Sequence, residues 1–206
     1  ILKNYLKEPV RIDDINLFRD SLKRLLNEIN EDETEEFNKN LVIHFLRNSL
    51  YRDRRFLVNT YRRTDLAIYV DAATQEEHPV VLFEVKGPGR PDMVSHDNMN
   101  KKAMHELVLY YLIEEVEKKN NDIKHLIITD CRQFFIFEKK EFFRLFAKNK
   151  SFSTKVLDAY NQGNDTSYIY SQIIAPEVER KQSMLQYTYI DLNSFKKDIE
   201  KDSIIM

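Results

Sequence analysis

Apolar residues recur at helical spacing in two stretches near the start of the chain. The first stretch predicts a helix over residues 11–30. An acidic run over residues 31–36 follows, and Thr34 within it is suited to cap a second helix. We expect His44 in that helix to be a satisfied core histidine and not a metal ligand. The inward positions expected in the two helices are Ile15, Phe18, Leu22, Leu25, Leu26, Ile29, Phe37, Leu41, His44, Phe45 and Leu50.

The pattern then changes to that of strands. Residues 56–60 predict a short strand, and residues 65–71 alternate, with Leu66, Ile68 and Val70 on one face. Residues 80–86 are almost continuously apolar until they end on Glu-Val-Lys. The polar linker over 72–79 suits a hairpin between these last two strands. A glycine- and proline-rich break over 87–91 follows directly.

Further helices and strands alternate along the second half of the chain. Helices are predicted over 98–118, 141–148 and 154–161, and strands over 125–129 and 134–137. Beyond residue 163 the pattern weakens to one strand over 184–190, and the rest of 164–206 is expected to be a connector. This order predicts an α/β fold with a mixed central sheet flanked by helices. It divides into an N-terminal helical segment (1–30), a core (31–150) and a C-terminal helical or connector segment (151–206).

Composition limits the classes of function. The chain has 206 residues, of which 42% are hydrophobic and 32% are charged, as in a soluble globular protein. No run approaches the roughly 20 apolar residues of a membrane span, no signal peptide is visible, and the cytoplasm is the expected location. The single cysteine, Cys131, cannot form an internal disulfide and is expected in the core. A net charge of −2 does not indicate a nucleic-acid binder, so any DNA contact must come from a local basic patch.

The hairpin brings two carboxylates together. In an antiparallel pair, opposed residues have a constant sum of residue numbers. A turn centred near 74–75 predicts a sum close to 149, which is the sum for Asp65 and Glu84. Alternate residues of a strand share a face, so Lys86 lies with Glu84 while Val85 points to the other face. The other face is expected to be core, and a register slip would bury the charges.

Two carboxylates and a lysine at one strand end suit phosphodiester hydrolysis. Nearby carboxylates repel each other unless they are protonated or bridged by a cation, and Mg²⁺ prefers such oxygen ligands. Such a cation acidifies water and neutralises charge on a phosphate, and Lys86 is suited to orient the water or hold the phosphate. The competing interpretation is a surface salt bridge at a strand end, because the pattern is short. The hairpin arithmetic, the apolar strand before Glu84 and the glycine break after Lys86 argue against it.

These residues resemble the PD-(D/E)xK nuclease superfamily. The wider series is similar to the N-terminal endonuclease domain of type IIG (type IIS-like) restriction–modification enzymes, over roughly residues 10–150 and more faintly 170–192. The residues that carry the resemblance are Glu35-Glu36-Phe37-Asn38-Lys39-Asn40, Phe45-Leu46, Tyr51, Val58-Asn59-Thr60, Thr64-Asp65-Leu66, Phe83-Glu84-Val85-Lys86, Met93, Asn100, Lys102-Ala103, Glu106-Leu107-Val108-Leu109-Tyr110-Tyr111, Ile127-Ile128-Thr129 and Phe134-Phe135-Ile136-Phe137.

The resemblance implies a restriction-endonuclease-like core and a Mg²⁺-dependent endonuclease, a type II site-specific deoxyribonuclease, acting on double-stranded DNA. Asp65, Glu84 and the carbonyl of Val85 would bind the metal, for which Mn²⁺ would substitute, and Lys86 would be the catalytic lysine. Glu36 matches a position where the superfamily often places an extra acid, although a solvated carboxylate at a helix start is equally expected.

The resemblance leaves three neighbouring positions open. Lys102 and Glu106 either face the active site or only pair with each other at i, i+4 spacing, which we favour slightly. His105 stands where the family has glutamine, so no role is assigned to it. Thr64 replaces the proline of the first motif, a change that the superfamily commonly tolerates.

DNA contacts are expected from basic side chains near the site. Arg62, Arg63, Arg90 and Lys102 are the candidates, and they would contact phosphates without reading sequence. The competing interpretation for the arginine-rich segment 52–63 is a solvated turn with local ion pairs, for instance to Asp53.

The expected partners are double-stranded DNA and, in the same polypeptide, methyltransferase and target-recognition domains. No Asn-Pro-Pro-Tyr motif or glycine-rich cofactor loop is found, so S-adenosylmethionine is expected only in a missing methyltransferase part. The chain alone is then expected to cleave poorly or without specificity, and a dimer is one way to cut both strands. The alternatives are a catalytically silent scaffold or DNA-binding module and, less favoured, a nucleotide hydrolase without a P-loop.

Overall fold

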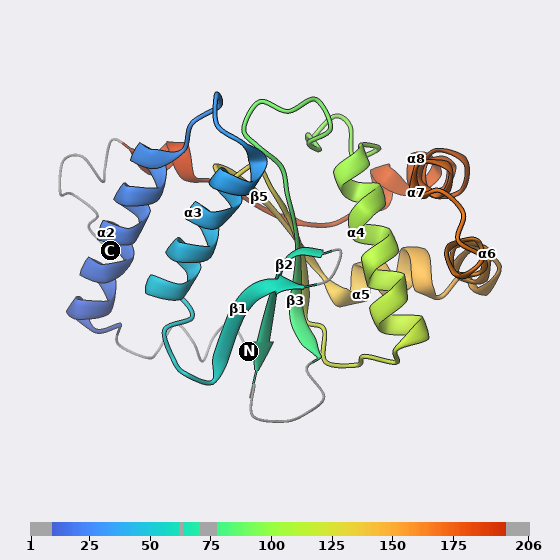
Figure 1. Cartoon of the computed structure of the whole chain (residues 1–206), viewed down its shortest axis with the longest axis horizontal. Coiled ribbons are helices and arrows are strands. Elements are labelled where there is room, and N and C mark those ends of the chain that lie inside the picture. Colours follow the sequence, from blue (N-terminus) through green and yellow to red (C-terminus); the bar gives the residue numbers. More distant parts are fainter. Residues whose placement is uncertain (1–9, 62–63, 71–77, 197–206) are drawn as a thin grey trace.

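A six-stranded mixed β-sheet forms the centre of the molecule, with helices on both faces (Figure 1). The computed structural model describes residues 10–61, 64–70 and 78–196. The strands follow one another across the sheet in sequence order, and every neighbouring pair is antiparallel except β3 and β4, which are parallel. The strands are β1 (Phe56–Tyr61), β2 (Thr64–Val70), β3 (Pro79–Val85), β4 (His125–Thr129), β5 (Gln133–Glu138) and β6 (Thr188–Asp191).

Helices α2 (Ile12–Glu28) and α3 (Glu35–Asn48) cover one face of the sheet (Figure 1). The expected cap is confirmed, since the Thr34 hydroxyl accepts a hydrogen bond from the Phe37 N–H at 3.1 Å. The inward stripe expected for the second helix is confirmed for Phe45, which is buried, and Leu41, which packs against the same core. It is wrong for Phe37, His44 and Leu50, which are exposed. The residues of α3 that are buried are Asn38, Lys39, Val42, Ile43, Phe45 and Leu46.

Asn38 lies on the buried face of α3 although its side chain is polar. The Asn38 side chain donates to the Asn30 and Thr34 carbonyls and accepts from the Asn30 N–H. These bonds satisfy the amide and fasten the loop before α3 to its first turn, so a polar residue is stable on the buried face. The spacing of apolar residues alone therefore does not show which polar residues of this helix are buried.

The expected register of the hairpin is confirmed. Leu66 pairs with Phe83 and Ile68 with Val81, both with the predicted sum, before a bulge shifts the register between Ile68 and Tyr69. Leu66, Ile68 and Phe83 belong to the core beneath α2 and α3. Val70 departs from the expectation, because at the far end of the strand it is 42% exposed.

A crossover connection joins the two parallel strands, as parallel pairing requires. It contains α4 (Lys102–Leu112), which continues as a π-helical segment, η1 (Ile113–Glu117). Helix α4 is buried along most of its length against the second face of the sheet, where Ala67, Leu82 and Ile128 point. Helices α5 (Lys139–Phe142), continued by η2 (Phe143–Ala147), and α6 (Lys150–Asn161) add to this layer.

The segment after residue 163 is more than a connector. It forms α7 (Thr166–Tyr168), η3 (Ile169–Ile174), α8 (Ala175–Lys181), η4 (Gln182–Met184), strand β6 and η5 (Leu192–Phe195). Ile169, Ile174 and Val178 are buried in the same core as α4. Strand β6 overlaps the strand expected over 184–190, whereas the short helices were not predicted because their π-helical pieces break the regular period that a sequence pattern detects. The division of the chain into three segments stays a prediction.

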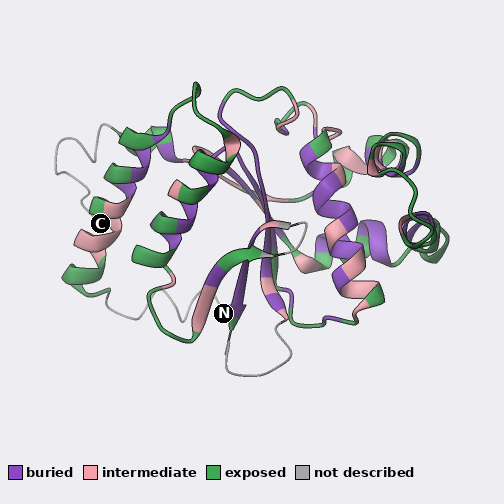
Figure 2. Cartoon of the chain, in the orientation of Figure 1, coloured by how far each residue is buried: buried purple, intermediate pink, exposed green. Residues whose placement is uncertain are grey.

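Because helices cover both faces, the middle strands β3 and β4 are largely buried on both sides, whereas the edge strand β1 is partly exposed (Figure 2). We expected one face of the sheet to be core and the other to carry the charged residues at the surface. This expectation is wrong, because Glu84 and Lys86 are themselves buried. Among the described residues, no helix is long and apolar enough to cross a membrane.

A pair of alanine substitutions on β2 tests this burial. Ile68→Ala should lower the free energy of unfolding by about 2–5 kcal/mol, because it leaves a cavity in a fully buried site. Val70→Ala, at the exposed end of the same strand and face, should cost less than about 1 kcal/mol. Urea denaturation monitored by circular dichroism measures both, and equal losses would contradict the arrangement.

Candidate functional site

Asp65 is the second residue of β2 and directly precedes Leu66, the first residue of that strand that is paired with β3, and Glu84 lies near the end of β3. Continuing the hairpin register places them opposite each other on one face of the sheet. The Asp65 Oδ2 atom accepts a hydrogen bond from the Val85 N–H at 3.1 Å, which fixes the carboxylate across the strand ends. The expected approach of Asp65 and Glu84 is confirmed, and the charge of Asp65 acts directly on the ionisation of Glu84.

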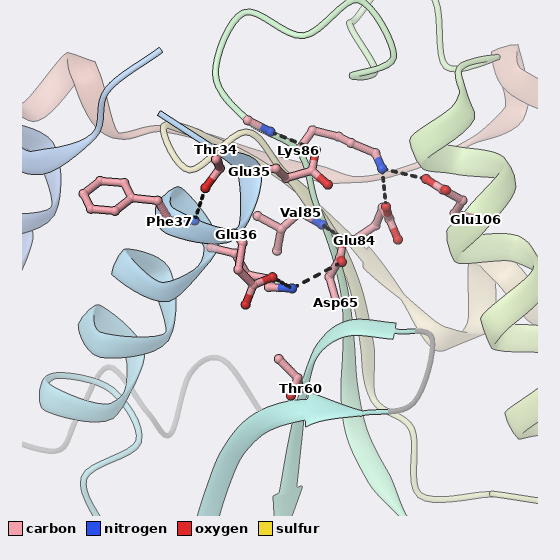
Figure 3. Close-up of polar contacts among 12 residues, drawn as sticks. Thr34, Glu35, Glu36, Phe37, Thr60, Asp65, Glu84, Val85, Lys86 and Glu106 are labelled. Carbon is pink, nitrogen blue, oxygen red and sulfur yellow. Dashed lines mark hydrogen bonds and ion pairs between the residues drawn. The ribbon is translucent and has the colours of Figure 1, made fainter. Parts of the chain in front are cut away.

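Lys86 lies between two carboxylates (Figure 3). Its Nζ is 2.6 Å from Oε1 of Glu84 and 2.7 Å from Oε2 of Glu106 on α4. The side chains of Lys86 and Glu84 are only 5% and 2% exposed. Buried charges of this kind are stable only when paired, so the three groups form one unit that ties the end of β3 to α4. The simple surface salt bridge is excluded, because this ion pair is buried.

Burial and neighbouring charge set the ionisation of this unit. Burial raises the pKa of Glu84 well above its usual value, and the negative charge of Asp65 adds to the effect. Burial alone would raise the pKa of Glu106 too, but hydrogen bonds from Glu84 and Lys86 outweigh it and lower that pKa. Burial alone would lower the pKa of Lys86, yet the two carboxylates outweigh it and raise that pKa. Lys86 is therefore a cation held beside an ionised Glu106.

One oxygen of Glu84 has no hydrogen-bond donor. Its Oε2 atom is buried and accepts no hydrogen bond from a described residue, and the protonated carboxyl of Glu84 can only donate to Glu106. The Val85 N–H faces Asp65, and its carbonyl points to the same side, because both groups of a strand residue do. Two carboxylates, a buried oxygen without a donor and a backbone carbonyl are an all-oxygen set that fits a hard divalent cation. Within the described ranges, no three side chains of the His, Cys, Asp and Glu types gather as a metal site.

A second lysine of the site, Lys39, was not predicted from the sequence. Its Nζ is 2.5 Å from Oε2 of Glu36 and 3.7 Å from Oδ1 of Asp65, and its side chain is 11% exposed. Glu36 therefore meets Asp65 only through this ammonium group. A signal existed, because Lys39 lies three residues before Val42 and seven before Leu46, on the stripe that the structure buries.

Glu106 both faces the site and pairs with Lys102, the two alternatives considered from the sequence. Its Oε1 atom is 3.5 Å from the ammonium of Lys102, while its Oε2 atom contacts Lys86. Lys102 is 56% exposed at the start of α4, so it joins the buried unit to solvent.

The glycine break forms the loop between the site and α4. The Gly87 N–H donates to Oε2 of Glu35 at 3.4 Å, so the start of α3 contacts this loop. Gly89 has a φ of +73°, a conformation that favours glycine. Arg90 is exposed, and its stem packs over Gly87. Cys131 is buried behind the loop, as expected, with Sγ 3.8 Å from the Lys86 carbonyl oxygen.

The first part of the arginine-rich segment, residues 52–55, lies far from the site. Because Phe56 pairs with Val70, residues 52–55 lie at the end of β1 opposite to Asp65, about 15 Å or more along the strand. Arg52 pairs with Asp14 and Arg55 with Asp53, which confirms local ion pairing for these arginines. Arg62 and Arg63 lie outside the described residues.

His105, for which no role was assigned, is held by the loop before α4. Its Nε2 atom is 2.6 Å from Oδ1 of Asn100, and Asn100 in turn donates to Glu179 on α8. Burial lowers the pKa of His105 to about 4, and the nearby charge of Glu106 only partly opposes this.

The chain belongs to a protein family described as a domain of unknown function (DUF7149), whose model matches residues 1–204. No curated protein and no solved structure matches the chain.

Acidification should reveal the low pKa of His105. The unfolded chain takes up a proton at this histidine below its usual pKa of 6.5, whereas the folded protein does so only near pH 4. Its contribution to stability is therefore present above pH 6.5 and lost as the pH falls from 6.5 to 4. Glutamine keeps a donor for Asn100 and does not titrate. His105→Gln should lose less stability than wild type over this interval.

Urea denaturation at several pH values measures the difference between the two profiles. His125→Gln, at an exposed position of β4, is the matched control for loss of a histidine. Parallel profiles for His105→Gln and wild type would contradict the prediction.

Proposed function

We propose that this chain is the endonuclease domain of a restriction–modification enzyme and that it hydrolyses phosphodiester bonds of double-stranded DNA with Mg²⁺. The observation that carries the proposal is the arrangement at the hairpin end: Asp65 accepts a hydrogen bond from the Val85 N–H, beside Glu84, and the Lys86 ammonium is 2.6 Å from Glu84. The fold supports it in general terms, since the acids lie on a hairpin of a mixed sheet and a long helix follows the lysine. We infer a restriction-endonuclease-like core on the same grounds.

Asp65, Glu84 and the Val85 carbonyl are the groups that would hold the cation. When bound, it would supply Lewis acidity toward a phosphate oxygen and toward water. Glu84 would contribute its second oxygen, which lacks a hydrogen-bond donor, and would give up the proton that burial favours. Asp65 is already oriented by the Val85 N–H and would bind with little rearrangement.

The protein's own residues would then stabilise charge on the phosphate. Lys86 has a raised pKa, so it would act as a cation that donates hydrogen bonds and not as a general base. Glu106 would hold its ammonium group in place from the side of α4. Lys102 and Arg90 are exposed near the same strand end, and we propose that they contact DNA phosphates. Arg62 and Arg63 remain candidates for the same role.

The proposal extends to partners and location. Methyltransferase and target-recognition domains of the same polypeptide would choose the DNA sequence, a dimer would cut both strands, and the enzyme would work in the cytoplasm. S-adenosylmethionine would bind to the methyltransferase and not to this chain.

One observation favours a second candidate, a catalytically silent DNA-binding or scaffold module. Lys86 is fully engaged by Glu84 and Glu106, so the charges are satisfied without any ligand. In that case the acids and the lysine would serve only to join β3 to α4.

Cleavage of supercoiled plasmid DNA separates the two candidates. Lys86→Met should reduce Mg²⁺-dependent cleavage by at least about 100-fold, because it removes a charge that stabilises the transition state. Glu84→Gln should do the same while keeping the shape of the side chain. Lys155→Met on α6, where the lysine is exposed, is the matched control and should retain wild-type activity. Equal cleavage by all four proteins would contradict the catalytic role of the site.

Metal binding is tested separately by thermal unfolding without DNA. A cation that binds only the folded state at 100 times its Kd should stabilise the protein by about 2.7 kcal/mol. Mn²⁺ should therefore raise the midpoint of wild type but not that of Asp65→Asn or Glu84→Gln. An identical rise in all three would show that the ion binds elsewhere and would favour the silent module.

A further inference from the structure

We infer that the site holds a single divalent cation, because the ammonium group of Lys39 occupies the position between Glu36 and Asp65 that a second cation would need. This inference rests on the proposed function and concerns the number of ions that the same carboxylates accept. It gives a role to a buried lysine that the proposed chemistry does not otherwise use.

The first step is the placement of Lys39. Lysine is almost never buried unless it is paired, and this side chain is 11% exposed. Its ammonium group lies between two carboxylates from different elements, Glu36 on α3 and Asp65 on β2. A cation shared by carboxylates from separate elements is the usual arrangement of a metal ion in a protein, and here the chain provides that cation itself.

The second step concerns the partners of the two carboxylate oxygens of Asp65. Oδ1 faces the Lys39 ammonium at 3.7 Å, while Oδ2 accepts the Val85 N–H on the side of β3. Each oxygen of Asp65 therefore has one described partner, and the side toward Glu36 is the side that already holds a positive charge. Glu36 itself is bound to Lys39 and has no described contact with the other acids except through it.

The third step is the balance of charge. Four carboxylates belong to the cluster, those of Glu36, Asp65, Glu84 and Glu106, and three ammonium groups are paired with them, those of Lys39, Lys86 and the more exposed Lys102. With all four carboxylates ionised, four negative and three positive charges leave a formal charge of −1, so one divalent cation is already enough to neutralise the cluster. A second divalent ion would carry the cluster to a positive charge and would lie against Lys39 in a partly buried setting, where repulsion is strong.

The experiment counts Mn²⁺ ions bound by the protein without DNA, by isothermal titration with electron paramagnetic resonance of free Mn²⁺ as a second readout. Wild type should bind one ion per chain. Lys39→Met keeps a side chain of similar length but removes the charge, so it should bind two. Adding Glu36→Gln to that variant removes the second pair of carboxylates and should return the count to one.

Two controls complete the design. Lys39→Arg keeps a positive charge and should bind one ion, and Lys23→Met, at an exposed position of α2, should also bind one. Circular dichroism identifies variants that fail to fold. If Lys39→Met is one of them, Lys39→Gln, which also removes the charge, takes its place and should bind two ions.

Each count supports the inference or overturns it. Two ions in wild type, or one ion in folded Lys39→Met, would overturn it and leave the proposed function standing. No ion in wild type would overturn the proposed metal site as well, so the two failures are distinguishable.

Discussion

The register of the β2–β3 hairpin is the constraint on which the remaining structure depends. Ile68 opposite Val81 and Leu66 opposite Phe83 fill the core beneath α2 and α3, while Ala67 and Leu82 fill the core beneath α4. A shift by one residue would exchange the side chains on both faces at once, and neither core could accept the exchange. The same register places Asp65 opposite Glu84, so packing far from the charges determines their separation.

The charges in turn join the layers. Lys86 connects β3 to α4 through Glu106, and Lys39 connects α3 to β2 through Asp65. Hydrophobic contact holds each helix against the sheet but allows sliding, whereas a buried ion pair has one short-range geometry. The two lysines therefore fix the ends of α3 and α4 relative to the strand ends, and they do so from opposite faces of the sheet.

The sequence predicted correctly those parts of the fold in which apolar residues recur at a regular spacing. The strand over 125–129 and the pairing of Asp65 with Glu84 followed from alternation and from the length of the linker, which are local properties. It failed where polar residues occupy buried positions: His44 was expected to be buried in α3 but is exposed, whereas Asn38 and Lys39 are buried there. It failed again after residue 163, where short π-helical pieces have no regular period. Lys39 was missed because its partners, Glu36 and Asp65, come together only in the folded chain.

The lysine that bridges Glu36 and Asp65 also affects how the molecule is assembled. The residues of the charge cluster come from α3, β2, β3 and α4, which are far apart along the chain. Closing such long loops is slow, and the contacts that reward it form only when both helical layers are in place. A partly folded chain thus has isolated, hydrated carboxylates and lysines and no cluster. The complete charge cluster requires both helical layers, so its presence marks a chain whose two layers have both closed on the sheet.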